Sequence, residues 1–342
     1  MKFFLPDFRS FRLSESYCIF ATLLFMQVYR NADFLPFFEK AVITIGTFDG
    51  VHTGHQQVIE QLKNEARKIN GQSVIITFDP HPRKIIHSAS TIKLINTTEE
   101  KIELLAKKGI DQLVIVPFTE EFSKLTAEQY VSEFLVKKFH PHTIIIGYDH
   151  RFGHGRLGDY HLLEELSLTF NYELLEIPVQ VLNAISVSST RIREAIAHAD
   201  IETANQLLGY SFFFEGLVEE GNKLGKKIGY PTANLKIENE EKIIPADGVY
   251  VVEVELKDEV KNAGKKYQGM MNIGFRPTVD GSKKMIEVNI FEFNENIYEK
   301  SLRVYCKKHI RAEQKFSGLD ALKEQLANDK KQAVEYFSTE KK

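Results

Sequence analysis

The sequence predicts an α/β domain built on a parallel sheet, followed by an all-β domain. From Ala41 onward, short β-branched runs alternate with helical stretches, a pattern typical of parallel strands with helices on both faces of the sheet. After about residue 211 the chain consists of short strand-like runs separated by glycine and asparagine turns, as in a barrel or sandwich. With 342 residues, of which 43% are hydrophobic, the chain can build two cores.

The parallel strands are expected in four runs that are apolar at both odd and even positions, as strands buried on both faces are. Between the first two runs a helix is expected, because apolar residues recur at three- and four-residue spacing before Gly71. A last helical stretch ends near Gly209, so we place this domain at residues 26–210. The four strand-like runs are residues 41–45, 73–78, 111–118 and 143–149.

The second domain, placed at residues 211–338, has several runs of strand character and little helix. A final amphipathic helix is expected around Leu319 to Phe337, with Leu322, Leu326 and Val334 roughly on one face. The strand-like runs are residues 212–221, 248–256, 266–274, 285–293 and 300–310.

The composition excludes several classes of protein. A formal net charge of −3 is not that of a nucleic-acid-binding or membrane-surface protein, so neither kind of partner is expected. Cys18 and Cys306 make neither a disulfide framework nor a zinc site, which agrees with a cytoplasmic protein. Residues 1–25 include an apolar run that is too short to span a bilayer and has no small-x-small cleavage site, so we expect a poorly structured extension.

The stretch TFDGVHTGH, residues 47–55, lies between a predicted strand and a predicted helix. Ligands bind at the carboxyl ends of parallel strands, and a helix N-terminus attracts phosphate through its unpaired N–H groups. Gly46 and Gly54 let the backbone approach a ligand, and His52 and His55 can both donate to one phosphate group, as nucleotidyl transfer requires. The alternative is that both histidines are surface residues of a turn. A metal site is less favoured, because no third His or Cys is nearby.

Two further loops of the first domain favour phosphate and substrate binding. In SVSSTRIRE, residues 186–194, the hydroxyls of Ser188, Ser189 and Thr190 can cap a helix and, with Arg191, hold a polyphosphate. An ordinary capped helix with solvated arginines is the alternative. The loop GYDHRFGHGRLGD, residues 147–159, follows a strand and has more glycines and charges than a plain connection needs.

In the second domain, GNKLGKKIGYPTANL at residues 221–235 is a glycine-rich loop. It is not a Walker loop, because Lys227 stands where Ser or Thr would bind magnesium. Thr232 and Asn234 supply hard oxygen ligands at alternate positions, which suits Mg²⁺ carrying nucleotide phosphates. A Pro-Thr turn with Asn as a hydrogen-bonding corner is the alternative.

The run MIEVNIFEF, residues 285–293, alternates between apolar and polar residues at its start. Ile286 and Val288 are expected to face the core, whereas Glu287 and Asn289 are expected to face away from it. A carboxylate in that position can accept a proton from a substrate hydroxyl, although exposed strand glutamates are common.

As a set, these motifs resemble the prokaryotic bifunctional riboflavin kinase/FMN adenylyltransferases, also called FAD synthetases. The resemblance runs from about Met26 to about residue 337. It implies a Rossmann-like nucleotidyltransferase domain, then a six-stranded β-barrel riboflavin kinase domain with a C-terminal helix. ATP would phosphorylate riboflavin to FMN in the second domain, and the first would adenylylate FMN to FAD with release of pyrophosphate. The matching motifs are IGTFDGVHTGH, GYDHRFG with RLGD, SSTRIRE, GYPTANL, DGVY, NIGFRPTV and IEVNIFEF.

The resemblance also implies roles for individual residues. His52 and His55 would steady the phosphates during adenylyl transfer. Glu287 would be the base for the riboflavin 5′-hydroxyl, and Thr232 and Asn234 would bind Mg²⁺.

Flavin would contact the loop of Asp149 and Arg151, according to the same resemblance. The chain departs from the family pattern at Lys226, where arginine is usual, at His150, where phenylalanine is common, and at Asn289, where histidine is frequent. The residues implied to contact ATP and its phosphates are Gly46, Phe48, Gly54, Ser188, Ser189, Thr190, Arg191, Gly225 and Gly229.

Two other functions stay open. A nucleotidyltransferase of another small phosphorylated substrate would share the histidine motif but would not need the second domain. A catalytically silent flavin- or nucleotide-binding module would have no use for all of the catalytic residue types present.

Overall fold

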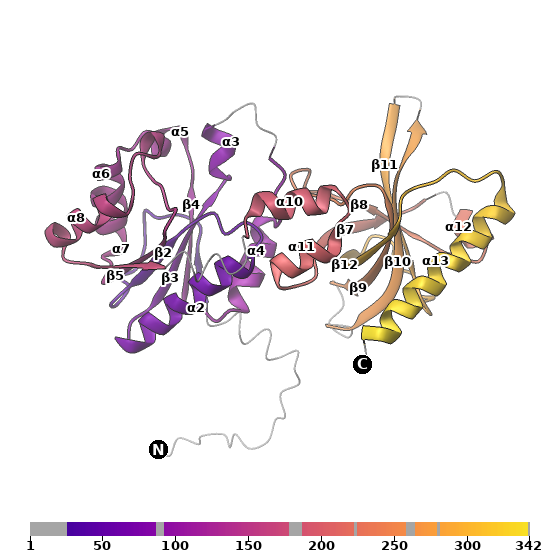
Figure 1. Ribbon diagram of the computed structural model, residues 1–342, viewed down its shortest axis with the longest axis horizontal. Coiled ribbons are helices and arrows are strands. Elements are labelled where there is room, and N and C mark those ends of the chain that lie inside the picture. Colours follow the sequence, from indigo (N-terminus) through magenta and orange to yellow (C-terminus); the bar gives the residue numbers. More distant parts are fainter. Residues whose placement is uncertain are drawn as a thin grey trace, which may run out of the picture.

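The computed structural model describes residues 26–86, 92–177, 187–221, 224–257, 264–278 and 281–340 (Figure 1). The expected N-terminal extension, residues 1–25, lies outside them. Within the described residues, no helix is both long enough and apolar enough to cross a membrane.

The N-terminal half is a six-stranded sheet in which every pairing is parallel, in the order β1-β4-β3-β2-β5-β6. After β2 the chain adds β3 and β4 on one side and later β5 and β6 on the other. The carboxyl ends of β2 and β5 therefore border the crevice where such sheets bind ligands. The strands are β1 (Gln27–Tyr29), β2 (Val42–Ile45), β3 (Ser73–Asp79), β4 (Gln112–Pro117), β5 (Thr143–Gly147) and β6 (Glu173–Ile177).

Helices cover both faces of this sheet, as the apolar strands predicted. Alternate residues of β3 show it, because Val74 and Ile76 pack in one buried cluster and Ile75 packs in another. The helices of this half are α2 (Thr53–Lys68), α3 (Pro82–Ile86), α4 (Thr98–Ala106), α5 (Glu120–Ser123), α6 (Ala127–Gln129), the π-helix η1 (Tyr130–Val136), α7 (Lys137–Phe139), the 3₁₀ turn η2 (His154–Arg156), α8 (Tyr160–Phe170), α10 (Ser189–Ala197) and α11 (Ile201–Leu208).

The C-terminal half is a closed antiparallel barrel in the order β10-β11-β8-β7-β12-β9. The long helix α13 (Leu319–Glu340) packs Ala333 and Phe337 against Val251 and Met270 of the barrel. The other elements are β7 (Phe213–Glu219), α12 (Leu224–Lys227), β8 (Ala233–Lys236), β9 (Gly248–Leu256), β10 (Lys266–Thr278), β11 (Gly281–Ile290) and β12 (Ser301–Arg311). The predicted order of fold classes, a parallel sheet and then a barrel, is confirmed.

One buried cluster joins the two halves. It contains Ile192 and Ile196 of α10, Leu208 of α11, Val304 of β12, and Ile95 from the loop before α4. In Figure 1, α10 and α11 lie between the sheet and the barrel. The halves therefore share part of one apolar core.

Candidate active sites

The loop after β2 has an unusual backbone. Phe48 and Val51 have φ of 48° and 36°, a region that side chains with a Cβ seldom occupy, and Gly50 has φ of 90°. The turn brings the chain back so that α2 begins at Thr53 with His52 as its N-cap. The predicted strand–turn–helix context of the histidine motif is therefore present, at the carboxyl end of β2.

The two histidines of this motif lie against each other. Their rings are stacked, with centroids 3.6 Å apart and planes 17° apart. His52 Nδ1 accepts the backbone N–H of His55 at 3.3 Å, so the proton of the neutral His52 ring is on Nε2. A Cβ at Gly54 would lie 3.3 Å from the His52 ring, and the Phe48 ring is 4.9 Å from that of His55. The structure thus brings Phe48, His52, Gly54 and His55 together.

Both rings are neutral at physiological pH. Burial lowers the pKa of His52 to about 4. The pKa of His55 lies well below its ordinary value, first because of burial and then because of the nearby His52 and Lys101. Among the described residues, His55 Nδ1 is buried and has no hydrogen-bond partner. Each neutral imidazole still has one N–H group, which can donate a hydrogen bond to an anionic ligand.

Asp49 joins the histidine loop to α10. Its carboxylate, 1% exposed, forms an ion pair with Arg193, and its backbone carbonyl accepts the Ser189 hydroxyl at 2.9 Å. Ser188 is the N-cap of α10 and accepts the N–H of Arg191 at 3.3 Å. The predicted serine motif and the histidine motif therefore lie side by side. Of the remaining predicted residues of this helix start, Thr190 and Arg191 are exposed.

Sequence reasoning missed two basic groups around this loop. The buried Lys101 of α4 donates to Thr47 O at 2.8 Å and to Thr77 Oγ1 at 3.3 Å, directly beneath the histidine loop. His81 follows β3, and burial lowers its pKa to about 4, with Asp49 opposing and Arg193 adding to the shift. A signal for His81 was available, since polar residues after a strand neighbouring β2 reach the same edge of the sheet.

The predicted flavin loop follows β5, the neighbour of β2, so it leaves the same edge of the sheet. Asp149 and Arg151 are both exposed, and Arg151 pairs with Asp159 at 2.7 Å. Phe152 and Gly158 bridge the base of the loop, and a Cβ at Gly158 would overlap the Phe152 ring. The loop is therefore closed on itself at its base.

The barrel brings a second set of predicted residues together. Asn234 of β8 is directly opposite Glu287 of β11 in the antiparallel pairing. Asn234 is 8% exposed, and its Oδ1 is buried without a hydrogen-bond partner among the described residues. A Cβ at Gly225 would overlap Tyr230 O and lie 3.3 Å from Thr232 Oγ1. The glycine-rich loop therefore packs tightly against the Thr232 hydroxyl.

Gly229 belongs to the same loop and has φ of 88°, and a Cβ added there would have no atom within 4 Å. Conformation, and not crowding, therefore requires glycine there.

Ile286 and Val288 lie in the barrel core, as the alternation predicted, but the burial of Asn289 on the other face of β11 was not expected. Asn289 shares a face of β11 with Glu287, but it is 6% exposed and donates to Pro231 O at 2.7 Å. The cause is the turn at residues 229–231, which folds over this face. Beside that turn is a cavity of about 440 Å³, lined by residues 229–231, residues 289–294 and Lys330 of α13.

Comparison with known proteins agrees with two catalytic domains. The FAD synthetase family matches residues 36–191, and the riboflavin kinase family matches residues 208–337. A bifunctional riboflavin kinase/FMN adenylyltransferase of Buchnera aphidicola is 38% identical over 88% of this chain and 95% of its own length. The corresponding proteins of Escherichia coli K12 and Bacillus subtilis are 36% and 35% identical, each over 89% of this chain and over 95% and 94% of their own lengths.

A crystal structure from Streptococcus pneumoniae has the same fold, with a TM-score of 0.79 and 32% identity over 90% of this chain and 98% of that one. It is described as a macrolide-efflux protein, a description that concerns the S. pneumoniae chain. The present chain belongs to the bifunctional riboflavin kinase/FMN adenylyltransferase family, and it phosphorylates riboflavin to FMN and adenylylates FMN to FAD with ATP.

Proposed function

We propose that the two reactions take place at two separate sites, adenylyl transfer at the histidine loop of residues 26–210 and phosphorylation at the Asn234–Glu287 pair of residues 211–338. The observation that supports this most is that, in each half, predicted residues from different segments lie close together. His52, Gly54, His55 and the start of α10 lie together at one edge of the parallel sheet, and Asn234 lies opposite Glu287 on neighbouring strands of the barrel.

In adenylyl transfer, an FMN phosphate oxygen attacks the α-phosphorus of ATP, and the bond to the β-phosphate breaks to release pyrophosphate. His52 and His55 donate N–H groups to the α-phosphate, whose charge increases in the transition state. Gly46 and Gly54 let the phosphates approach the backbone. Ser188, Ser189, Thr190 and Arg191 hold the departing phosphates at the positive end of α10. The loop of Asp149 and Arg151 contacts the flavin.

The donor set of the barrel fits Mg²⁺. Asn234 Oδ1 is a buried oxygen without a partner among the described residues, and Thr232, two positions earlier in the sequence, supplies a hydroxyl on the loop side. Hard oxygen ligands of this kind hold Mg²⁺ together with nucleotide phosphates. When bound, Mg²⁺ would neutralise charge on the ATP phosphates.

In phosphorylation, Glu287 accepts the proton of the riboflavin 5′-hydroxyl as that oxygen attacks the γ-phosphorus, and ADP leaves. Gly225 and Gly229 run along the phosphates. The cavity of about 440 Å³ begins at Gly229, where the phosphate loop ends. Its position favours binding of the ATP nucleoside there.

We propose that the protein acts in the cytoplasm, where ATP is available. The low cysteine content, two residues in 342, supports this placement.

Glu287→Gln tests the assignment of the kinase site. This variant should lose most FMN formation from riboflavin, while supplied FMN is still converted to FAD. Glu295→Gln, the same change at an exposed position in the following turn, is the matched control and should keep both activities. Riboflavin phosphorylation by Glu287→Gln at the control rate would refute the role of Glu287 as base.

A further inference from the structure

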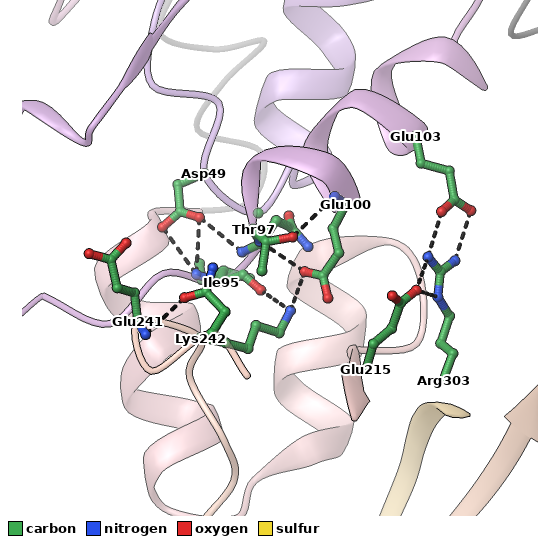
Figure 2. A network of polar contacts seen from close by, with 12 residues as sticks. Asp49, Ile95, Thr97, Glu100, Glu103, Glu215, Glu241, Lys242 and Arg303 are labelled. Carbon is green, nitrogen blue, oxygen red and sulfur yellow. Dashed lines mark hydrogen bonds and ion pairs between the residues drawn. The ribbon is translucent and has the colours of Figure 1, made fainter. Parts of the chain in front are cut away.

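Lys242 is a buried lysine in a kinase-domain segment, residues 240–243, that crosses to the first domain (Figure 2). Its side chain is 2% exposed, and its Nζ donates to Ile95 O at 2.6 Å and to Glu100 Oε2 at 2.5 Å. Burying an ammonium group costs free energy unless it is paired and hydrogen-bonded. None of the reaction steps proposed above uses this lysine.

The carbonyl that Lys242 binds belongs to the peptide unit that Asp49 also binds. Ile95 C=O and Asn96 N–H lie in one planar peptide group. The Asn96 N–H donates to Asp49 Oδ1 at 3.1 Å, and the Ile95 N–H donates to the same oxygen at 3.0 Å. Lys242 and Asp49 therefore hold one peptide group from opposite ends, as Figure 2 shows.

Backbone bonds from the same kinase-domain segment fix the residues just before this peptide group. Leu94 N–H donates to Glu241 O at 2.7 Å, and Ile243 N–H donates to Leu94 O at 2.9 Å. Lys93 Nζ donates to Glu240 O at 2.5 Å. The kinase domain thus holds residues 93–95, together with Arg193 of α10, whose Nε donates to Lys93 O at 2.7 Å.

Residues 95 and 96 in turn support the backbone of the histidine loop. Phe48, Gly50 and Val51 all have positive φ, a conformation that persists only where the surroundings determine it. The Asp49 carboxylate supplies that constraint through Ile95 and Asn96. A Cβ at Gly50 would be only 3.1 Å from Ile95 Cδ1, so the two segments are in close contact.

We propose that Lys242 is a positioning residue for FMN adenylylation, supplied to the first domain's site by the kinase domain. It fixes the Ile95–Asn96 peptide group, which fixes Asp49 and the loop that ends at His52. The proposal rests on the role proposed above for the histidine loop.

The test uses Lys242→Met in the full-length chain, with FMN adenylylation and riboflavin phosphorylation measured separately. The kcat of FMN adenylylation should fall about 10- to 100-fold, the size expected when a catalytic group is displaced by a fraction of an ångström to about 1 Å. The KM for FMN should change less than kcat, and riboflavin phosphorylation should stay close to wild type. Hydrogen exchange of the amides in residues 47–52 and 92–97 should become faster.

Arg303→Met is the matched control. Arg303 is also buried, at 3% exposure, and pairs across the same interface with Glu103 of α4, and within its own domain with Glu215. In Figure 2 this ion pair lies apart from the Ile95 peptide group. Its loss should loosen the interface without selectively lowering the kcat of adenylylation or exposing the amides of residues 47–52.

Equal losses in the two variants would overturn the proposal, because a general loosening of the interface would then explain them. An unchanged kcat in Lys242→Met would also overturn it. If Lys242→Met alone does not fold, the double variant with Glu100→Gln, which removes both buried charges, has the same expected result. A His52→Ala variant with normal FAD formation would instead refute the proposed function on which the inference rests.

Discussion

His52 caps helix α2 and also belongs to the proposed adenylyl-transfer site, and two substitutions separate these roles. His52→Ala removes the cap, which costs about 1 kcal/mol, and the stacking on His55, which costs about 0.5–1.5 kcal/mol. His52→Asn restores a good capping side chain, because the amide oxygen can accept the His55 N–H. The Asn variant should therefore recover about 1 kcal/mol of stability relative to the Ala variant.

The rate of adenylylation should not recover with stability. In the wild type, Nδ1 is used by the cap and Nε2 carries the proton at the far side of the ring. An asparagine that caps the helix has its N–H groups on a shorter side chain, which cannot reach the position of Nε2. Both variants should therefore lose about 10²–10³-fold in FAD formation, the size typical of removing one charge-stabilising donor.

The assay is FAD formation from supplied FMN and ATP, with the flavins separated by chromatography, together with urea unfolding of each variant. Riboflavin phosphorylation in the same samples reports whether the barrel is folded. A wild-type rate in His52→Asn would refute the reasoning, because capping alone would then explain the histidine. The reasoning would also be refuted if the rate of FAD formation recovered from the Ala to the Asn variant in step with the recovery of stability.

Two further results are expected. Burial lowers the pKa of His52, His81 and His150 to about 4, whereas the unfolded chain protonates its histidines near pH 6.5. The free energy of unfolding should therefore be highest above pH 6.5 and should fall as the pH drops from 6.5 toward 4. His81→Gln should flatten this fall by up to about 1.4 kcal/mol per pH unit, measured by urea unfolding between pH 7 and 5, and an unchanged slope would contradict the assignment. Asn234→Ala should raise the Mg²⁺ concentration for half-maximal riboflavin phosphorylation about 10- to 100-fold and leave FMN adenylylation unchanged. If Asn234→Ala has the same Mg²⁺ dependence as the wild type, the assignment of Asn234 as a Mg²⁺ ligand is refuted.

The interior of the fold could be predicted from the sequence better than its edges. Strands β2 to β5 are buried on both faces, and a continuous run of β-branched residues predicts a strand of this kind. In the barrel, the four-residue β8 was missed, because it overlaps the predicted glycine-rich loop. In the parallel sheet, the two strands that were missed are its edges. β1 is three residues long and starts with an exposed glutamine, and β6 includes the exposed Glu173 and Glu176. Partly solvated edge strands lack the apolar run by which the others were identified.

The linear site motifs could be predicted because their residues are close in sequence. The roles of Asp49, Lys101 and Lys242 could not, because each depends on a partner in a distant segment. Asp49 is 144 positions from Arg193, and Lys242 is 142 positions from Glu100. The burial of Asn289 was missed for the same reason, since the covering turn comes from residues 229–231.

Mixing two disabled variants tests most directly whether the chain has two separate sites. His52→Ala and Glu287→Gln are combined with riboflavin, ATP and Mg²⁺, and the flavins are separated over time. We expect FMN from the first variant to be adenylylated by the second, so that the mixture makes FAD from riboflavin at least about tenfold faster than either variant alone. A mixture no faster than the single variants would contradict the division into two sites.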